Sequence, residues 1–298
     1  MRHPPRRVVF RLANGGFSRK IENHAAAVAP RSSADTTEVL ESRAVAKKVL
    51  SSFAEMLPRI YELKDMTDQS HSDAYFRNFE NRFAEGRTVL ACYERLERQL
   101  SALDDEAWGD LKSRAAPVAH IRGSGRGWQT LFDTLNEAKG YVYLRGIGCT
   151  GIEFIKRSNR KTPDLGAFRD GTRVLCEVKT INVSQDEAAR RAEIAQGASV
   201  VHETSAEVRA EMLKKVSSTL QDGIDQLDCE DPQRVARRIV FTVLNFDDWV
   251  GDYQPEYIAQ LDAHLLANPV VGAELVFCAA SNLFERRFAM RSASVVEI

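Results

Sequence analysis

The chain has 298 residues, of which 44% are hydrophobic and 28% are charged, and its formal net charge is −1. This composition is typical of a globular protein with enough chain for a sizeable core, and the charge argues against indiscriminate coating of nucleic acid. The apolar runs are too short for a membrane span and the five cysteines are odd in number without a Cys-x-x-Cys pair, so we expect a cytoplasmic protein without membrane contact, disulfide scaffold or structural zinc.

The N-terminal part divides into an arm and a helical region. Residues 1–36 are rich in arginine, poor in acids and broken by proline and glycine. They predict a flexible basic arm or a small hairpin with a strand at 8–12, although a mitochondrial transit peptide has a similar composition. Apolar residues then recur at three- and four-residue steps over 37–57 and 73–104, which predicts long helices. We take 37–115 as an α-helical domain whose apolar stripes pack in a core or bind a partner, for example in a homodimer.

Residues 122–127 read Arg-Gly-Ser-Gly-Arg-Gly. Their composition is typical of a linker, but the glycines could also expose backbone N–H groups to a phosphate, with Arg126 beside them. The segment lacks the Gly-Lys-Ser/Thr ending of a nucleotide-binding P-loop, so that kind of site is excluded.

The C-terminal part, residues 116–298, alternates between predicted strands and helices. We expect helices at 128–139, 186–227 (interrupted near 197) and 254–267. We expect strands at 141–144, 152–156, 238–245 and 273–280, together with one strand that begins at 164 and another that ends at 179. This alternation predicts an α/β domain in which helices flank a mixed sheet.

The most informative segment is 162–180, in which a Pro-Asp pair precedes Glu177-Val178-Lys179 at the end of an apolar run. Asp170-Gly171 is a hairpin turn signal between the two parts, and Pro163 places Asp164 at the beginning of its strand. Because side chains alternate along a strand, Glu177 and Lys179 share one face. Two carboxylates and one ammonium can therefore meet at one sheet edge, as is needed to hold a divalent metal beside a water molecule.

The acid-x-Lys pattern alone is weak, because it also occurs at residues 62–64, 110–112 and 137–139. Those three matches lie in predicted helices or helix ends, and none follows a Pro-Asp pair. The alternative for 177–179 is an ordinary hairpin with an exposed Glu/Lys pair. That alternative explains poorly why charged residues should follow a run as apolar as Val-Leu-Cys.

The order of the predicted elements, with Thr162-Pro163-Asp164-Leu165 and Cys176-Glu177-Val178-Lys179, resembles the PD-(D/E)xK nuclease superfamily, in a variant found in uncharacterised bacterial proteins. The resemblance covers about residues 127–246 and implies a restriction-endonuclease-like sheet. It also implies a Mg²⁺-dependent nuclease, with Mn²⁺ as a substitute. DNA is favoured over RNA as the substrate, and an endonuclease in defence, restriction or repair is the leading expectation, while RNA and an exonuclease stay open as alternatives.

By the same resemblance, Asp164 and Glu177 would be metal ligands together with the carbonyl of Val178, and Lys179 would orient or deprotonate the attacking water. Such families often add an acid from the first helix. Glu137 near the end of the predicted helix is one candidate and Glu153 on the next strand is its competitor, while an ordinary surface glutamate remains an alternative for each.

The charge around the motif also favours a polyanionic partner. Residues 120–179 contain eleven Lys/Arg against six Asp/Glu. Within this segment, Arg157, Arg160 and Lys161 lie just before the Pro-Asp pair and could contact phosphates beside the scissile bond. A solvated charged loop is the alternative. The second hypothesis for the whole chain is a catalytically silent, nuclease-like module that binds nucleic acid or protein.

Overall fold

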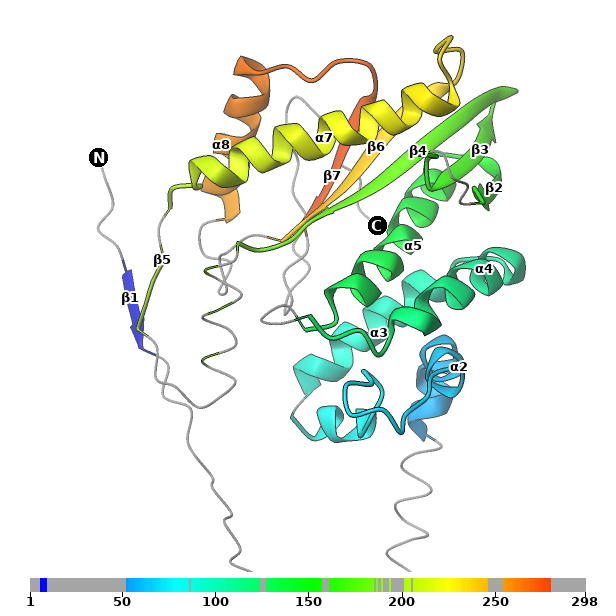
Figure 1. Cartoon of the computed structure of the whole chain (residues 1–298), viewed down its shortest axis with the longest axis vertical. Coiled ribbons are helices and arrows are strands. Elements are labelled where there is room, and N and C mark those ends of the chain that lie inside the picture. The colour runs from blue at the N-terminus through cyan, green and yellow to red at the C-terminus, as the bar shows by residue number, and fades with distance from the viewer. Residues whose placement is uncertain are drawn as a thin grey trace, which may run out of the picture.

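The computed structural model describes most of the chain (Figure 1). The described residues are 6–9, 52–85, 87–123, 127–156, 161–184, 186, 189, 193, 201–204, 206–245 and 254–279.

The centre of the fold is a five-stranded mixed sheet in the order β2-β3-β4-β6-β7. Its strands are β2 (Thr150–Phe154), β3 (Leu165–Arg169), β4 (Thr172–Ile181), β6 (Arg237–Leu244) and β7 (Glu274–Ala279). The first three strands pair antiparallel, whereas β4, β6 and β7 are parallel to one another. The predicted mixed sheet flanked by helices is therefore confirmed.

Helices cover the sheet on both faces (Figure 1). Helix α5 (Gln129–Gly146) packs on the face to which Cys176 and Val178 of β4 belong. Helices α7 (Ala210–Glu230) and α8 (Gln254–Ala267) share a second hydrophobic cluster with Leu175 of β4 and Val240 of β6. Because strand side chains alternate, the α7 face also carries Glu177 and Lys179.

The turn between β3 and β4 is the one that its sequence predicts. Asp170 and Gly171 both have positive φ, at 50° and 76°, as a two-residue type I′ hairpin turn requires. Arg169 therefore pairs with Thr172, and the register continues to Leu165 opposite Cys176. This short turn fixes how far Asp164 lies from the Glu-x-Lys segment.

The helical region before the sheet packs against α5. It comprises α2 (Pro58–Asp65), η1 (Phe79–Glu85), α3 (Arg87–Ser101), α4 (Asp105–Ala115) and η2 (Ala116–Val118). Buried residues of these helices belong to the same hydrophobic cluster as α5 and one face of the sheet. The region is thus joined to the sheet by a common core, and the predicted domain boundary at residue 116 stays a prediction.

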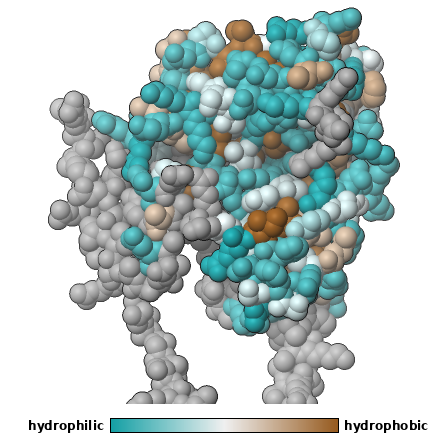
Figure 2. Space-filling model, viewed as in Figure 1, coloured by the Kyte–Doolittle hydropathy of each residue, from teal (hydrophilic) through white to brown (hydrophobic). Residues whose placement is uncertain are grey.

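The surface drawn in Figure 2 is mainly hydrophilic, with apolar residues in small separate patches. Large apolar side chains are concentrated in the two clusters that lie on either face of the sheet. Within the described part of the chain, we find no helix that is both long enough and apolar enough to cross a bilayer.

Two predicted elements near the sequence motif are wrong. Residues 141–144, expected as a strand, continue α5 to Gly146. Tyr141, Tyr143 and Leu144 are buried there between the sheet and the N-terminal helices, so packing overrides the strand propensity of the aromatic side chains. Residues 201–204 lie within the expected helix 186–227 but form strand β5, which pairs antiparallel with β1 (Arg6–Val9).

The long helix expected over 73–104 is also wrong. Turns and the 3₁₀ helix η1 precede α3, which begins only at Arg87. Asn78 adopts φ 55°, which a continuous right-handed helix does not allow. Most of residues 1–51 lies outside the described residues, so the basic arm, its hairpin turn and the helix beginning near Thr37 stay predictions.

Gly140 controls how closely α5 approaches the sheet. A Cβ at this position would lie 2.5 Å from Cγ2 of Val178 and 3.0 Å from Cδ1 of Leu165. We predict that Gly140→Ala lowers the free energy of unfolding by about 1–3 kcal/mol, because the added methyl overpacks this contact. Urea denaturation provides the measurement.

Gly109 is the matched control for this substitution. It lies exposed within helix α4, where an added Cβ would meet nothing within 4 Å. Gly109→Ala should therefore stabilise by up to about 1 kcal/mol, as expected for a helix-interior glycine. Equal effects of the two substitutions would contradict a close contact at Gly140.

Candidate functional site

The candidate site lies where β3 ends and β4 continues beside β6. Pairing between β3 and β4 stops at Leu165 and Cys176. Beyond this pair, the side chain of Asp164 provides β4 with the hydrogen-bond acceptor that a longer β3 would have provided. Its Oδ2 accepts a hydrogen bond from the backbone N–H of Val178 at 2.9 Å. Because the N–H and C=O of one strand residue point to the same side, the Val178 carbonyl is directed toward Asp164 as well.

Glu177 and Lys179 form an ion pair on the face of β4 that α7 covers. Lys179 Nζ lies 2.6 Å from Oε1 of Glu177. The Glu177 side chain is only 3% exposed, and no described residue offers its Oε2 a hydrogen bond. A buried carboxylate oxygen without a donor is costly unless a proton or a cation compensates it.

Burial also changes the acidity of Glu177. The loss of water, followed by the nearby charge of Asp164, raises the pKa of Glu177 to about 8, although Lys179 acts in the opposite direction. We attribute the shift to two carboxylates that share one poorly hydrated place. Such a place favours either a bound proton or a bound cation.

Gln226 on α7 is a site residue that the sequence motif does not reveal. Its Oε1 accepts a hydrogen bond from Lys179 Nζ, and its Nε2 donates to the carbonyl of Thr162 at 3.3 Å. Gln226 thus connects the lysine with the loop that carries Asp164. One sequence signal is the glycine inside α7: a Cβ at Gly223 would lie 3.5 Å from Cε of Lys179, so the helix passes close to this side chain.

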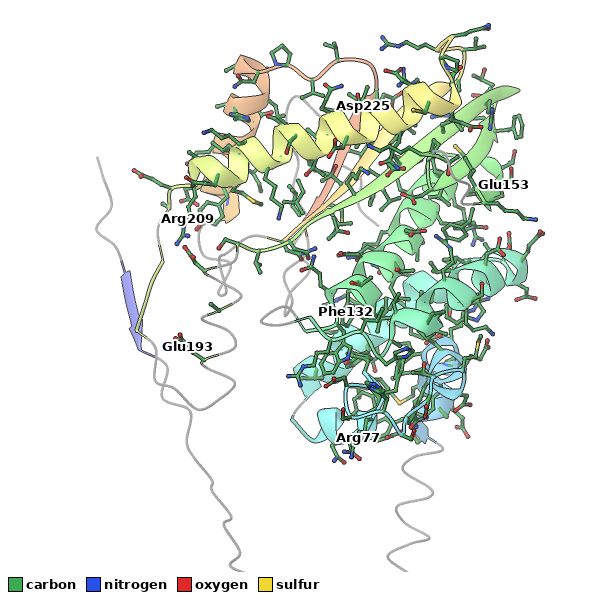
Figure 3. The ribbon with its side chains drawn as sticks, in the orientation of Figure 1. Arg77, Phe132, Glu153, Glu193, Arg209 and Asp225 are labelled. Atoms are coloured by element: carbon green, nitrogen blue, oxygen red, sulfur yellow. The ribbon has the colours of Figure 1, made fainter. Side chains whose placement is uncertain are left out.

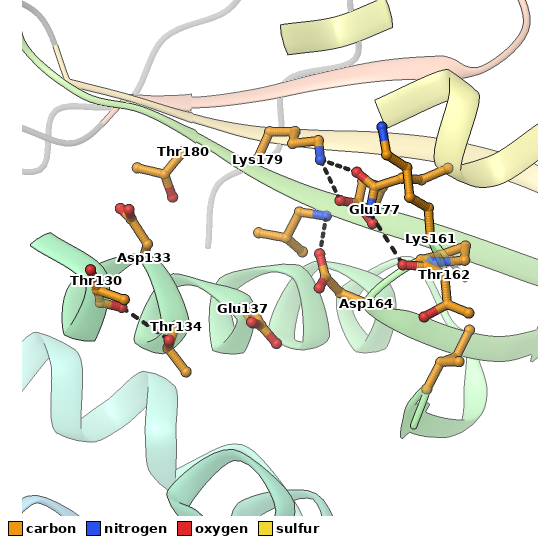
Figure 4. Close-up of a pocket in the computed structure, with 14 residues that line it drawn as sticks. Thr130, Asp133, Thr134, Glu137, Lys161, Thr162, Asp164, Glu177, Lys179 and Thr180 are labelled. Carbon is orange, nitrogen blue, oxygen red and sulfur yellow. Dashed lines mark hydrogen bonds and ion pairs between the residues drawn. The ribbon is translucent and has the colours of Figure 1, made fainter. Parts of the chain in front are cut away.

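These groups line one pocket with a volume of about 430 Å³ (Figure 4). Its walls come from the first turns of α5, the loop before β3, the second half of β4 and one residue of α7. The lining residues are Thr130, Asp133, Thr134, Glu137, Ile155, Lys161, Thr162, Pro163, Asp164, Glu177, Val178, Lys179, Thr180 and Gln226.

The two candidates for an additional acid occupy different places. Glu137 lines the pocket, but its Oε2 forms an ion pair with Arg114 of α4. Glu153 lies on the outer strand β2, is exposed and does not line the pocket (Figure 3). The structure therefore brings Glu137 to the site as the partner of an arginine and leaves Glu153 outside it.

The predicted phosphate contacts are only partly described. Lys161 is exposed and lines the pocket beside Thr162. Arg126, Arg157 and Arg160 lie outside the described residues, so their contact with a substrate stays a prediction.

The donor atoms suit a hard divalent cation. No cluster of three or more His, Cys, Asp or Glu side chains within the described residues could hold a metal. The candidate ligands are the carboxylates of Asp164 and Glu177 and the carbonyl of Val178, all of them oxygen donors. Mg²⁺ commonly binds through one or two carboxylates and keeps several waters, and the Glu177 oxygen without a donor would be compensated by a cation. The residues present therefore fit Mg²⁺.

Comparison of the chain with models of protein families, with curated proteins and with solved structures finds no match. The function must therefore be argued from the geometry of this pocket and from the resemblance of its motif.

The acidity of Glu177 leads to a prediction about stability without metal. Its pKa is 4.5 in the ordinary case and about 8 in the folded protein, so the folded state keeps a proton that the unfolded state releases between these values. The free energy of unfolding should therefore fall as the pH rises through this window, by up to about 1.4 kcal/mol for each unit of pKa shift. Glu177→Gln should remove this dependence and be more resistant to urea than the wild type near pH 8.

Asp110→Asn provides the control, because Asp110 is an exposed carboxylate on α4 that follows the same acid-x-Lys pattern. Its urea midpoints should follow those of the wild type at every pH. If the midpoints of Glu177→Gln also ran parallel to the wild type, Glu177 would not hold the extra proton.

Proposed function

We propose that this chain is a Mg²⁺-dependent nuclease that hydrolyses phosphodiester bonds, with DNA as substrate and internal cleavage in defence, restriction or repair. The observation that carries the proposal is the convergence of Asp164, Glu177, Lys179 and the Val178 backbone on one pocket. None of the other three acid-x-Lys segments contributes both its acid and its lysine to this pocket. A cytoplasmic location is part of the proposal, and the five free cysteines agree with it.

The order of elements supports a restriction-endonuclease-like fold. Helix α5 is followed by the antiparallel strands β2, β3 and β4, then, after β5 in its separate two-stranded sheet, by the crossover helix α7 and the parallel strand β6. This is the order that the resemblance implies, with the Pro-Asp pair before β3 and the Glu-x-Lys residues on β4.

Each of the chain's own site residues has a separate role in the proposed chemistry. When bound, Mg²⁺ supplies charge neutralisation for the phosphate and lowers the pKa of water. Asp164 is oriented by the Val178 N–H, and Glu177 is oriented by Lys179. Lys179 lies beside both Glu177 and Gln226 and can position the attacking water. Lys161 at the pocket provides positive charge for an adjacent phosphate.

We expect the purified protein to convert supercoiled plasmid to nicked or linear DNA in the presence of Mg²⁺ or Mn²⁺. Asp164→Asn, Glu177→Gln and Lys179→Met should each lower the cleavage rate by roughly 100-fold or more, because each removes a ligand or the group beside the water. Asp164→Asn and Glu177→Gln should also abolish any Mg²⁺-dependent increase in Tm.

Asp110→Asn is again the matched control and should cleave at the wild-type rate. Cleavage that persists in all three site variants would place the active site elsewhere. Binding of nucleic acid that requires no divalent metal, without any cleavage, would instead support the silent binding module.

Gln226 allows a separate test of how Lys179 is positioned. Gln226→Leu removes the hydrogen bonds to Lys179 and to the Thr162 carbonyl, so the cleavage rate should fall by about tenfold or more because a small misplacement of a catalytic group is costly. The Mg²⁺-dependent Tm increase should persist, because Gln226 contacts neither carboxylate in the described hydrogen bonds.

Gln221→Leu is the control on the same helix, since Gln221 is exposed and bonds to Asp225 outside the pocket. A Gln226→Leu variant as active as Gln221→Leu would show that Lys179 needs no support from α7.

A further inference from the structure

Arg114 brings a positive charge from the N-terminal helical region to the back of the pocket. It lies in the last turn of α4, which packs against α5 and β2. Its Nη1 forms an ion pair with Oε2 of Glu137 on α5, and Glu137 lines the pocket. Arg114 is not among the described residues that line the pocket, so it acts on the site through Glu137.

The guanidinium of Arg114 is held both by Glu137 and by an aromatic ring. Its Cζ lies 4.5 Å from the centre of the ring of Phe154, the last residue of β2. This cation–π contact keeps the planar group in place. The side chain of Arg114 is 22% exposed and that of Glu137 is 6% exposed. An ion pair with so little water around it is costly to break, because a remaining charge would be poorly compensated.

Glu137 lies in the same pocket as the proposed cation ligands but is turned away from them. Figure 4 shows its carboxylate directed away from Glu177, whereas the carboxylate of Asp164 is directed toward β4. A further carboxylate among the ligands would raise the affinity for a divalent cation, because affinity depends on the number of charged ligands. To become a ligand, Glu137 would have to give up Arg114 and leave the guanidinium without its carboxylate.

We propose that Arg114 is a positioning residue that holds Glu137 as its counter-ion and keeps this carboxylate from binding the divalent cation. The inference rests on the proposed nuclease function and adds that the helical region controls the affinity of the site for its cation. With Asp164, Glu177 and the Val178 carbonyl as ligands, Mg²⁺ keeps octahedral positions for water and for a phosphate oxygen. An additional carboxylate would take one of these positions.

A double-mutant cycle on Arg114 and Glu137 tests this role by cation binding alone. Electron paramagnetic resonance measures free Mn²⁺ during titration of the full chain, without nucleic acid, for the wild type, Arg114→Met, Glu137→Gln and the double variant. Methionine keeps an apolar contact with the Phe154 ring but carries no charge. We expect Arg114→Met to bind Mn²⁺ roughly tenfold or more tightly than the wild type, because Glu137 becomes an additional charged ligand.

The dependence on Glu137 distinguishes this role from a general effect of charge. We expect Glu137→Gln to weaken Mn²⁺ binding about tenfold more in the Arg114→Met background than in the wild-type background. A purely structural role of Arg114, or an effect of its field alone, would make the two effects equal and would overturn the inference. Lys112→Met is the matched control, since Lys112 lies on the same helix and pairs with Glu62 outside the pocket. It should bind Mn²⁺ as the wild type does.

Arg114→Gln replaces Arg114→Met if the methionine variant does not fold. Glutamine keeps a hydrogen-bond donor for Glu137 without the positive charge, so the same difference between the two backgrounds is expected.

The outcomes separate this inference from the proposed function. A larger effect of Glu137→Gln in the Arg114→Met background would support the role of Arg114 even if the wild type cleaves no nucleic acid, in which case only the nuclease proposal fails. Equal effects in both backgrounds would overturn the role of Arg114 even if the wild type cleaves plasmid. Absence of Mn²⁺ binding in all four proteins would overturn both the inference and the proposed metal dependence.

Discussion

The arrangement of the site depends on one hydrogen bond, from the backbone N–H of Val178 to the carboxylate of Asp164. β4 is longer than β3, so the edge of β4 beyond Cys176 needs another acceptor for its N–H group. Asp164 provides this acceptor from the residue just before β3. The same bond fixes one carboxylate at the sheet edge, directs the Val178 carbonyl toward it and brings it near the adjacent Glu177. A requirement of backbone pairing thus generates the geometry that the proposed chemistry needs.

Two helix-interior glycines allow the helices to close on this part of β4 from both faces. Gly140 of α5 faces Val178, and Gly223 of α7 faces Val240 and Lys179. Each glycine costs about 1 kcal/mol relative to alanine in a helix, and each brings low-polarity surface close to the charged residues. Burial of Glu177 on the α7 face, followed by the nearby charge of Asp164, raises its pKa. The two glycines thus lower the stability of the helices next to the residues that carry the proposed activity. A cost of this kind is common at functional sites.

Much of the sheet and of the motif could be predicted from sequence because their signals are local. The Asp170-Gly171 turn, the apolar run before Glu177 and the β-branched residues of β6 each determine their own segment. Tyr141 and Tyr143 could not be placed, because burial on two sides of α5 outweighs their strand propensity. Gln226 and Asp133 were missed for a different reason. Each lines the pocket and contacts a residue more than forty positions away. Apart from the glycine inside α7, the sequences of the two helices carry no signal of such a partner.

The parallel pairing of β4 with β6 has a consequence for how the site is assembled. Asp164 and Val178 lie within one hairpin, whereas Gln226, the second partner of Lys179, lies in the crossover helix α7, 47 positions further along the chain. Local contacts form at a lower entropic cost than distant ones. The oxygen ligands are therefore encoded in a short segment that could be inherited as a unit, while the orientation of the lysine belongs to the fold as a whole. Insertions between β4 and α7 could diversify during evolution, as long as the crossover helix still docks on the sheet.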